Sequence, residues 1–426
     1  MNSPVVSRIS DDSLTPTQVA DAIAEAFPAG RFAGKRVLTI VPDNTRTAPV
    51  GLLFKALHAQ ISAATADFDI MIALGTHPPM TEAAICERLE ISQLERTAHY
   101  GAVHFFNHEW DNPAALRHLG VIPAAEINEL SGGLFSMDVP VTINQRLFEY
   151  DQIIILGPVF PHEVVGFSGG NKYLFPGVSG PEILNFFHWL GAVITNPLII
   201  GQKMTPVRRV VDRAAAMVAL PKECICMTAD KTRFAGLFIG SPEAAWDAAS
   251  TLSRQLHVVL KERPFHTILS CAPKMYDELW VGGKCMYKLE PVLADGGELI
   301  IYAPHIHEIS AVHGRLIKEL GYHCRDYFLK QWDKYKDYPW GVIAHSTHVH
   351  GVGTYENGVE KRRALVTLAT GISPEVCKRI NFGYRDPASI RIEDYANREH
   401  EGVLYVPNAG ESLYQLKGDQ TSTASC

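Results

Sequence analysis

The sequence predicts an α/β protein with two α/β domains, each built on a mostly parallel sheet. Short apolar runs alternate with helical patterns along most of the chain, and this order of strand, helix and strand is typical of parallel sheets with helices on both faces. The length of 426 residues also exceeds what one hydrophobic core usually supports. Because the pattern breaks at Glu262-Arg263-Pro264, we expect an N-terminal domain at residues 1–262 and a C-terminal domain at residues 263–426.

Local patterns place the individual elements. Residues 37–41 and 70–74 are continuous apolar runs, as expected of strands that are buried on both faces, and residues 50–63 between them have a helical pattern. Ser241 before Pro242 combines an N-cap hydroxyl with proline at the first helical position, so a helix should begin there. A further helix is expected at residues 181–190, and further strands at residues 153–156, 224–227, 268–270, 299–303 and 342–344.

Composition and charge argue against several classes of function. The formal net charge is −7 and the basic residues form no stripe along the sequence, which disfavours nucleic-acid binding. No apolar run is long enough to span a bilayer, and residues 1–13 are too polar for a secretory signal. The cysteines are scattered, and Cys224 and Cys226 alternate as strand residues do, so we expect reduced structural thiols. These features favour a cytoplasmic enzyme that acts on a small molecule.

Polar side chains gather where the predicted strands end. Asp43, Thr45 and Arg46 follow one predicted strand, and His77 follows the next. The carboxyl ends of parallel strands meet at one edge of a sheet, where ligands bind. Each residue also has a plainer reading, because Asp43 and Arg46 could form a turn with its salt bridge and His77 could be a structural loop histidine. We favour a site, since independent residues have no reason to gather at successive strand ends.

A short segment rich in glycine and proline carries two histidines and a lysine. It runs from His162 through Ser168-Gly169-Gly170 and Lys172 to His188. Small residues let backbone N–H groups close around an anion, and a lysine just beyond them adds a cation or a nucleophilic amine. Imidazole groups add acid–base or metal-binding capacity. We expect a cofactor site here; the alternative for His188 is a core histidine within its helix.

The C-terminal domain adds Lys284 after two glycines, the residue Trp332, and a run of three histidines. His345, His348 and His350 follow the strand expected at residues 342–344. Three histidines so close together could indicate a metal site, but no carboxylate or cysteine completes a set of ligands. We therefore prefer hydrogen bonding at a domain interface as their role.

Several of these pieces match one known family. The pieces are Asp43-x-Thr45-Arg46 with Pro49, Gly75-Thr76-His77, Asn107-His108-Glu109-Trp110, and His162 to Gly177 followed by His188. With them the chain resembles the nickel-dependent lactate racemase family over nearly its whole length, and the segment from His162 to Gly177 is the specific part. Members of that family carry a nickel-pincer nucleotide derived from nicotinic acid.

The resemblance implies a role for each candidate residue. Lys172 would bind the nickel-pincer nucleotide covalently and His188 would be the protein ligand to nickel. His77 and His162 would be the paired acid–base residues. The substrate would be bound by Asp43, Arg46, Lys284 and Trp332, and the cofactor also by Thr45, Ser168, Gly169 and Gly170. Cofactor and substrate would lie between the two domains, and cofactor-biosynthesis enzymes would be needed for maturation.

By the same resemblance, the chain is a racemase or epimerase of a 2-hydroxy acid. One histidine would take the hydroxyl proton while hydride passes from C2 to the cofactor, and return of the hydride to the other face would invert the centre. The lactate enzymes have glutamine three residues before the second-domain lysine, where this chain has Val281. The loss of an amide beside C2 predicts a 2-hydroxy acid other than lactate, with a larger or apolar side chain.

Two other functions are alternatives. Ser168 to Lys172 could be the phosphate loop of a nucleotide-dependent transferase, but its spacing differs from G-x-x-x-x-G-K-[ST], and Tyr173 stands where magnesium would need a hydroxyl. The chain could also be a non-catalytic protein that binds the cofactor or a hydroxy acid, because site residues alone do not guarantee catalysis.

Overall fold

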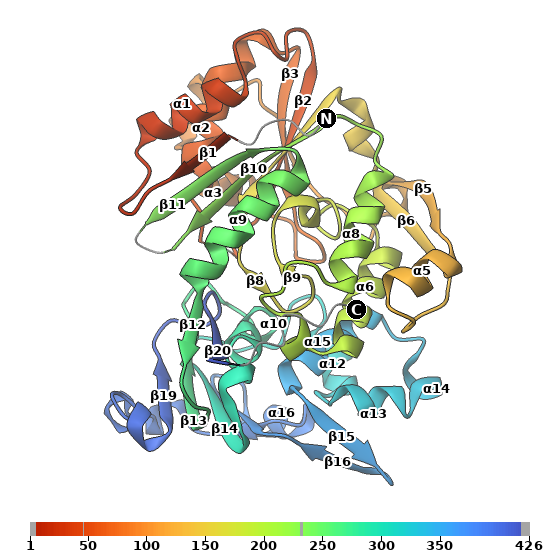
Figure 1. Ribbon diagram of the computed structural model, residues 1–426, viewed down its shortest axis with the longest axis vertical. Coiled ribbons are helices and arrows are strands. Elements are labelled where there is room, and N and C mark those ends of the chain that lie inside the picture. The colour runs from red at the N-terminus through yellow and green to blue at the C-terminus, as the bar shows by residue number, and fades with distance from the viewer. Residues whose placement is uncertain (1–5, 46, 231–232, 419–426) are drawn as a thin grey trace. The chain divides into compact units, whose positions relative to one another are not determined.

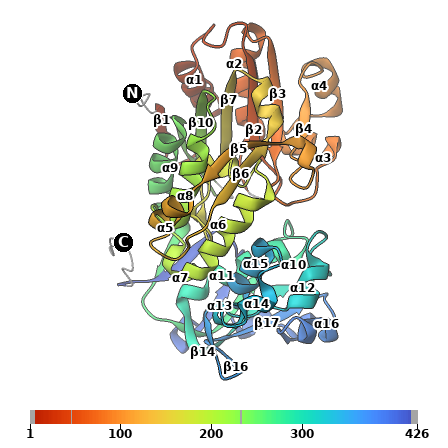
Figure 2. The ribbon, with the colours of Figure 1, turned by 90° about the vertical axis from the view of Figure 1, so that its right-hand side faces the viewer.

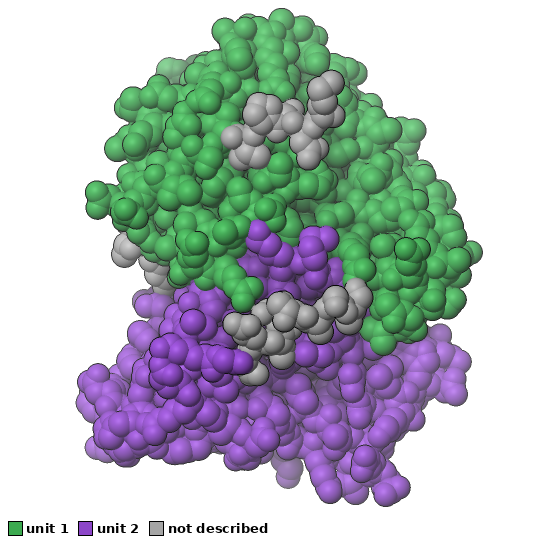
Figure 3. All heavy atoms as spheres, viewed as in Figure 1, with its two compact units in different colours: residues 1–160, 168–184, 208–256 green, residues 161–167, 185–207, 257–426 purple. Residues whose placement is uncertain are grey.

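The computed structural model describes residues 6–45, 47–230 and 233–418, and the predicted substrate-binding residue Arg46 lies outside these ranges. The chain forms two compact units (Figure 3). The first comprises residues 1–160, 168–184 and 208–256, and the second comprises residues 161–167, 185–207 and 257–426. The second unit therefore takes residues 161–167, 185–207 and 257–262 from the region predicted to form the N-terminal domain. As a result His162 and His188 belong to the second unit, whereas Ser168 to Lys172 belong to the first.

A mostly parallel sheet forms the centre of the first unit (Figure 1). Its strands are β1 (Val6–Ile9), β2 (Arg36–Pro42), β3 (Asp67–Ala73), β4 (Phe105–Asn107), β7 (Gln152–Pro158), β10 (Lys222–Ala229) and β11 (Phe234–Gly240). Their order is β1-β11-β10-β7-β2-β3-β4. Within this sheet, as far as the structure describes it, β11 pairs antiparallel with β1 and β10, and the other pairings are parallel. Figure 2 shows the parallel strands β7, β2 and β3 side by side. The strands predicted in this unit are confirmed.

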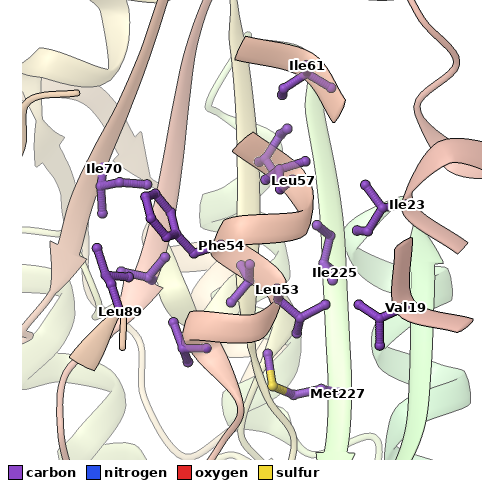
Figure 4. Packing of buried hydrophobic residues seen from close by; sticks show 14 of the residues in the cluster. Val19, Ile23, Leu53, Phe54, Leu57, Ile61, Ile70, Leu89, Ile225 and Met227 are labelled. Carbon is purple, nitrogen blue, oxygen red and sulfur yellow. The ribbon is translucent and has the colours of Figure 1, made fainter. Parts of the chain in front are cut away.

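Three helices cover one face of this sheet and bury its apolar side chains (Figure 4). They are α1 (Pro16–Ala26), α2 (Val50–Ile61) and α3 (Glu82–Arg88). Leu53 and Phe54 of α2 pack into a cluster with Ile70 of β3 and Ile225 of β10, and all of them are buried. Burial of each such side chain contributes about 1.5–3 kcal/mol to folding. Helix α2 confirms the helix predicted at residues 50–63.

The other face of the sheet is met by α9 (Pro242–His257). This helix begins as the sequence predicts, because the Ala244 N–H donates to Ser241 Oγ at 3.3 Å. Thr228 Oγ1 of β10 donates to Ala249 O at 3.2 Å and fixes the helix against the sheet. The unit also contains α4 (Gln93–Ala98), α5 (Ala124–Leu130), α8 (Pro206–Ala216), whose first residues lie in the second unit, the antiparallel pair β5 (Leu116–Ile122) and β6 (Val139–Asn144), and the 3₁₀ helices η1 (Ser62–Ala64), η2 (Pro113–Ala115), η3 (Gln145–Glu149) and η4 (Gly170–Tyr173).

The second unit is built on a parallel sheet of its own. Its strands are β13 (Phe265–Cys271), β14 (Leu293–Ala303), β17 (Leu365–Thr370), β18 (Gly383–Tyr384) and β19 (Val403–Val406), in the order β18-β17-β14-β13-β19. All four pairings are parallel, which confirms the strands predicted at residues 268–270 and 299–303. Two-stranded sheets join β8 (Pro161–His162) to β9 (Gly166–Phe167), β12 (Val258–Lys261) to β20 (Leu413–Leu416), and β15 (Gly353–Glu356) to β16 (Val359–Arg362).

Many short helices complete the second unit. They are α6 (Pro181–Ile194), whose first residues lie in the first unit, α7 (Asn196–Ile199), α10 (Leu279–Gly282), α11 (Lys284–Tyr287), α12 (Gly314–Leu320), α13 (Arg325–Leu329), α14 (Trp332–Tyr335), α15 (Trp340–His350), α16 (Pro374–Arg379), and the 3₁₀ helices η5 (Glu290–Val292), η6 (Pro387–Ser389), η7 (Ile392–Asp394) and η8 (Glu399–Glu401). Helix α6 confirms the helix predicted at residues 181–190 and extends it.

One predicted strand is wrong. Residues 342–344 lie inside α15, so His345, His348 and His350 follow helical spacing rather than the alternation of a strand. The apolar run is buried within the helix, and a short run of this kind does not distinguish a buried strand from a buried helix segment.

Two expectations from composition, on membrane spans and on cysteines, can be compared with the described residues. In the described ranges no helix is long and apolar enough to cross a membrane. The seven cysteines in the same ranges are free thiols and are all buried, in agreement with the expectation of reduced structural cysteines.

Candidate active site

The loops after β2 and β3 bring Asp43 and His77 into contact. The two strands are parallel neighbours, so their carboxyl ends lie together and the loops leave from the same edge. His77 Nδ1 lies 2.5 Å from Asp43 Oδ2. The backbone N–H and the hydroxyl of Thr45 donate to Asp43 Oδ1 at 3.1 and 2.7 Å. The structure therefore joins three of the residues that the sequence placed at strand ends.

This contact fixes the protonation pattern of the His77 ring. Burial alone would raise the pKa of Asp43, but the charge and hydrogen bond of His77, together with the hydrogen bonds of Thr45, lower it well below its usual range. Asp43 is thus a carboxylate, which only accepts hydrogen bonds, so Nδ1 of His77 carries a proton. In the neutral ring the lone pair is then on Nε2. With its side chain 30% exposed, His77 can present that nitrogen as a base.

The Lys172 loop owes its shape to two glycines. Gly169 and Gly170 have φ angles of +85° and +59°, in the left-handed region that favours glycine. A Cβ at Gly169 would lie 2.6 Å from Val159 Cγ2, and one at Gly170 would lie 2.9 Å from Trp246 Cβ. Ser168 closes the loop, because its Oγ accepts the Phe160 N–H at 2.9 Å. The hydroxyl of Ser168 is therefore engaged with the backbone of its own loop.

Helices α8 and α9 hold this loop from behind. Arg208 is only 1% exposed, lies 3.4 Å from Gly169 O through Nη2, and stacks on the Trp246 ring with its Cζ 3.9 Å from the ring centroid. The Trp246 indole N–H donates to Ser168 O at 2.9 Å. Asn171 Nδ2 donates to Asp212 and Glu243 at 3.0 and 2.8 Å. These contacts hold the loop directly before Lys172 in place.

Lys172 lies half-buried in η4, and its segment is tied to the His77 loop. The Gly75 N–H donates to Gly177 O at 3.0 Å, and the Gly177 N–H donates to Lys172 O at 3.2 Å. Gly157, near the end of β7, lets the ring of Tyr173 approach the backbone closely, because a Cβ added at Gly157 would lie 2.3 Å from that ring. The first unit thus brings the Asp43–His77 pair and the Lys172 loop into one framework.

In the second unit, His162 lies in the tight hairpin of β8 and β9. It is 6% exposed, and its Nδ1 accepts the Val164 N–H at 3.1 Å. Gly166 makes the turn with a φ angle of +83°, and the Gly201 N–H donates to its carbonyl at 2.9 Å. Gly191 of α6 packs on Val164, where an added Cβ would lie 3.1 Å from Cγ1. The backbone around His162 is therefore fixed from two sides.

Helix α6 presents His188 and buries the residue that follows it. The His188 ring is half-buried and stacks on Phe187 with the ring centroids 4.7 Å apart. Trp189 is fully buried, and Trp332 of α14 stacks on it with the centroids 5.4 Å apart and the planes 3° from parallel. Trp332 also packs edge-to-face on Trp340. Trp332 thus packs on α6, the helix that carries His188, and on α15.

Lys284 lies at the start of α11, beside an aromatic cluster. It is 6% exposed, and its Nζ lies 4.6 Å from the centroid of the Tyr276 ring, in a cation–π arrangement. One turn earlier, Trp280 lies between His313 and His345, with ring centroids 4.4 and 3.8 Å from its own. Val281 is buried in α10, between Trp280 and Lys284 in sequence.

The three histidines of α15 are buried and uncharged. Burial, and then the charges of His348, His313 and His188, lower the pKa of His345 well below its usual range. Burial lowers the pKa of His348 and of His350 to about 4. The Tyr322 hydroxyl lies 3.3 Å from His345 Nε2. Among the described residues no group of three or more His, Cys, Asp and Glu side chains is arranged to hold a metal ion.

The candidate residues are divided between the units. The first carries Asp43, Thr45, His77, Ser168, Gly169, Gly170 and Lys172, and the second carries His162, His188, Lys284 and Trp332. Sequence reasoning missed Arg88, Arg208 and Trp246. Arg88 Nε lies 3.4 Å from Pro42 O and its Nη1 lies 3.5 Å from Ala48 O, so it spans the loop that carries Asp43. These three are isolated residues in helices, and no local sequence signal separates them from ordinary helix residues.

Comparisons with known proteins place part of the chain in a family. A family model described as the lactate racemase N-terminal domain matches residues 17–197. The curated lactate racemase of Thermoanaerobacterium thermosaccharolyticum is 26% identical over 165 residues, which is 38% of this chain and 34% of that protein. The match therefore spans about a third of the length of that relative.

Two solved structures resemble the whole chain. A protein from Thermotoga maritima, solved by a structural genomics consortium, is 33% identical with a TM-score of 0.88, over 96% of this chain and 100% of that one. The lactate racemase apoprotein from T. thermosaccharolyticum is 18% identical with a TM-score of 0.71, over 95% and 94% of the two chains. At that identity the likeness concerns the fold, and it agrees with the mostly parallel α/β architecture. On these sequence matches, the region of this chain at residues 17–197 belongs to the lactate racemase family.

Proposed function

We propose that the protein is a racemase or epimerase that inverts C2 of a 2-hydroxy acid. The observation that carries the proposal is the Asp43–His77 pair, with 2.5 Å between Oδ2 and Nδ1, in the same framework as the Lys172 loop. A histidine whose Nδ1 proton is held by a carboxylate is a base at Nε2, and a hydroxyl proton is what such a base would remove. Membership of residues 17–197 in the lactate racemase family supports this reaction class.

The residues fit the nickel-pincer nucleotide that the resemblance implies. The first unit offers the Lys172 amine on a loop that Arg208 and Trp246 hold, which suits covalent attachment. The second unit offers the half-buried His188 imidazole, a ligand that suits nickel. A single histidine would be enough if the cofactor supplies the remaining ligands, and the described residues contain no preformed cluster of three. When bound, this group would supply the hydride chemistry at C2.

The side chains of the protein would handle the protons and the orientation of the substrate. His77 would take the hydroxyl proton at Nε2, and Asp43 would stabilise the imidazolium that results. When the hydride returns to C2, His162 would give a proton to the substrate oxygen. In the reverse reaction, His162 would take the hydroxyl proton. Arg46, which lies outside the described residues, would pair with the substrate carboxylate through its planar fork. Lys284 and Trp332 would contribute to substrate binding from the second unit.

The substrate that we propose is a 2-hydroxy acid other than lactate. Val281 stands three residues before Lys284, where the lactate enzymes have a glutamine, so its side-chain amide is absent here. The neighbouring Trp280 packs between His313 and His345. An apolar residue beside a tryptophan favours a longer or larger substituent at C2 than a methyl group.

The test uses holoenzyme made by co-expression with cofactor-biosynthesis enzymes. Intact mass spectrometry should show an adduct on Lys172, and chiral chromatography should show inversion of at least one acid in a panel that runs from lactate to aryl, dicarboxylic and sugar acids. A well-folded protein that stays unmodified and nickel-free under these conditions would count against the proposal. Adduct without turnover on the panel would favour the alternative of a non-catalytic binding protein. Binding of a nucleoside triphosphate in calorimetry would favour the transferase.

A further inference from the structure

The Nδ1 atom of His162 has two neighbours of opposite character. The Val164 N–H donates to it at 3.1 Å, and Glu163 Oε2 lies 3.3 Å away. A ring nitrogen that accepts the Val164 N–H carries no proton, so the proton of the neutral ring is then on Nε2. Glu163 Oε2 is close enough to form an ion pair with His162 once the ring is protonated, and a negative charge at that place favours a proton on Nδ1. In the structure Nδ1 is therefore an acceptor, and Glu163 is the neighbouring carboxylate that could become its partner when Nδ1 gains a proton.

Proton accounting shows which state the reaction needs. To act as a base, His162 must have a bare Nε2, so its proton must be on Nδ1. To act as an acid, it must begin as imidazolium, give the Nε2 proton to the substrate oxygen, and finish neutral with the proton on Nδ1; otherwise an imidazolate would form. Both roles therefore place a proton on Nδ1, and that proton needs an acceptor. Val164 N–H cannot accept a hydrogen bond, whereas the Glu163 carboxylate can.

The surroundings make a negative partner necessary. His162 is 6% exposed, and burial disfavours a charged imidazolium. The Lys288 ammonium, itself 3% exposed, donates to Pro161 O, next to His162 in the hairpin, and its positive charge disfavours imidazolium further. The Glu163 side chain is 15% exposed, and its charge also reaches His348 of α15, whose pKa it raises against the larger effect of burial.

We propose that Glu163 is the positioning residue for His162, holding the Nδ1 proton of that ring as Asp43 holds the Nδ1 proton of His77. The inference rests on the proposed function, since it concerns the acid–base pair of that reaction. Each of the two histidines then has its own carboxylate. Asp43 comes from the loop after a neighbouring strand, whereas Glu163 is the next residue in the chain, a position that gives no sequence signal.

The experiment compares Glu163→Gln, Glu163→Asp and the control Glu356→Gln, which removes the same charge from an exposed position of β15 in the same unit. Nitrogen NMR of apoprotein labelled at histidine reports the tautomer and titration of His162, assigned by the resonance that is lost in His162→Asn. In wild type, Nδ1 should become protonated on acidification. In Glu163→Gln the pKa of His162 should fall by about one unit, while Glu163→Asp restores part of the shift and Glu356→Gln changes nothing.

Holoenzyme kinetics supply the second readout. Glu163→Gln should lower kcat by about 10–100-fold and move the His162 limb of the pH profile to lower pH, with partial recovery in Glu163→Asp. Unchanged titration of His162 in Glu163→Gln would overturn the inference, as would wild-type His162 that never carries a proton on Nδ1. Because the NMR needs neither cofactor nor turnover, failure of wild-type holoenzyme to invert any acid would count against the proposed function alone. If Glu163→Gln fails to fold, the wild-type tautomer and Glu163→Asp decide the question.

Discussion

The substitution Asp43→Asn removes the carboxylate that holds the Nδ1 proton of His77. Two unit charges about 4 Å apart attract by about 4 kcal/mol at an effective dielectric constant of 20. His77 is 30% exposed, so solvent and salt screen part of this attraction. The amide can also donate to Nδ1 and so favour a proton on Nε2, which blocks the base. A comparable Asp→Asn change in Ser-His-Asp triads lowers kcat by about 10⁴-fold, and we expect about 10³-fold here.

The assay is steady-state inversion by cofactor-loaded enzyme, followed by chiral chromatography. Asp69→Asn is a matched control, because Asp69 is also buried in the first unit and also contacts a histidine, with 3.1 Å between Oδ1 and His104 Nδ1. Asp69 also accepts a hydrogen bond from the Tyr150 hydroxyl at 2.7 Å. Loss of the Asp69 carboxylate should therefore lower thermal stability without lowering kcat in the folded enzyme. Retention of more than about a tenth of wild-type kcat in Asp43→Asn would refute the assignment of His77 as a base held by Asp43.

Four further outcomes are expected. Lys172→Arg keeps the positive charge but should show no adduct in the intact mass after co-expression, and an adduct of unchanged mass would place the attachment elsewhere. Gly157→Ala puts a Cβ 2.3 Å from the Tyr173 ring and should lower the free energy of unfolding by about 1–3 kcal/mol; an unchanged thermal midpoint would show that the ring moves freely. Val281→Gln should raise kcat/KM for lactate relative to larger acids by about tenfold, and a ratio that does not change would contradict its role in selectivity. Because the pKa of Asp43 is depressed in the folded chain, its contribution to stability should be full above the unfolded pKa near 4 and lost as pH falls through the lower folded value; Asp43→Asn should flatten that part of an acid-unfolding curve, and identical curves would argue against it.

Sequence patterns were sufficient for the site of the first unit because β2 and β3 are parallel neighbours. Continuous apolar runs identified both strands, and parallel pairing then required Asp43 and His77 to share an edge. The Gly169-Gly170 pair likewise follows from backbone geometry, since only glycine tolerates both the φ angles and the approach of Val159 and Trp246.

The rest depends on tertiary contacts that leave no local pattern. Residues 342–344 are apolar on every side because α15 is buried, so their run resembled a buried strand. The assignment of His162 and His188 to the second unit follows from packing such as that of Gly191 on Val164, which is not encoded in the spacing of either histidine. Arg208 supports the Lys172 loop from α8, a helix that begins only at Pro206, and its sequence neighbours give no indication of that contact.

The central claim is inversion of C2 by hydride transfer, with protein side chains moving only the hydroxyl proton. The most direct test incubates cofactor-loaded enzyme with one enantiomer of a turned-over 2-hydroxy acid deuterated at C2, in ordinary water. Chiral separation with mass detection should show the opposite enantiomer with its deuterium retained, and Lys172→Arg should form none. Product that has exchanged its C2 deuterium for solvent hydrogen would mean that C2 loses a proton rather than a hydride. Absence of any inverted product from enzyme that carries the Lys172 adduct would contradict the proposed function itself.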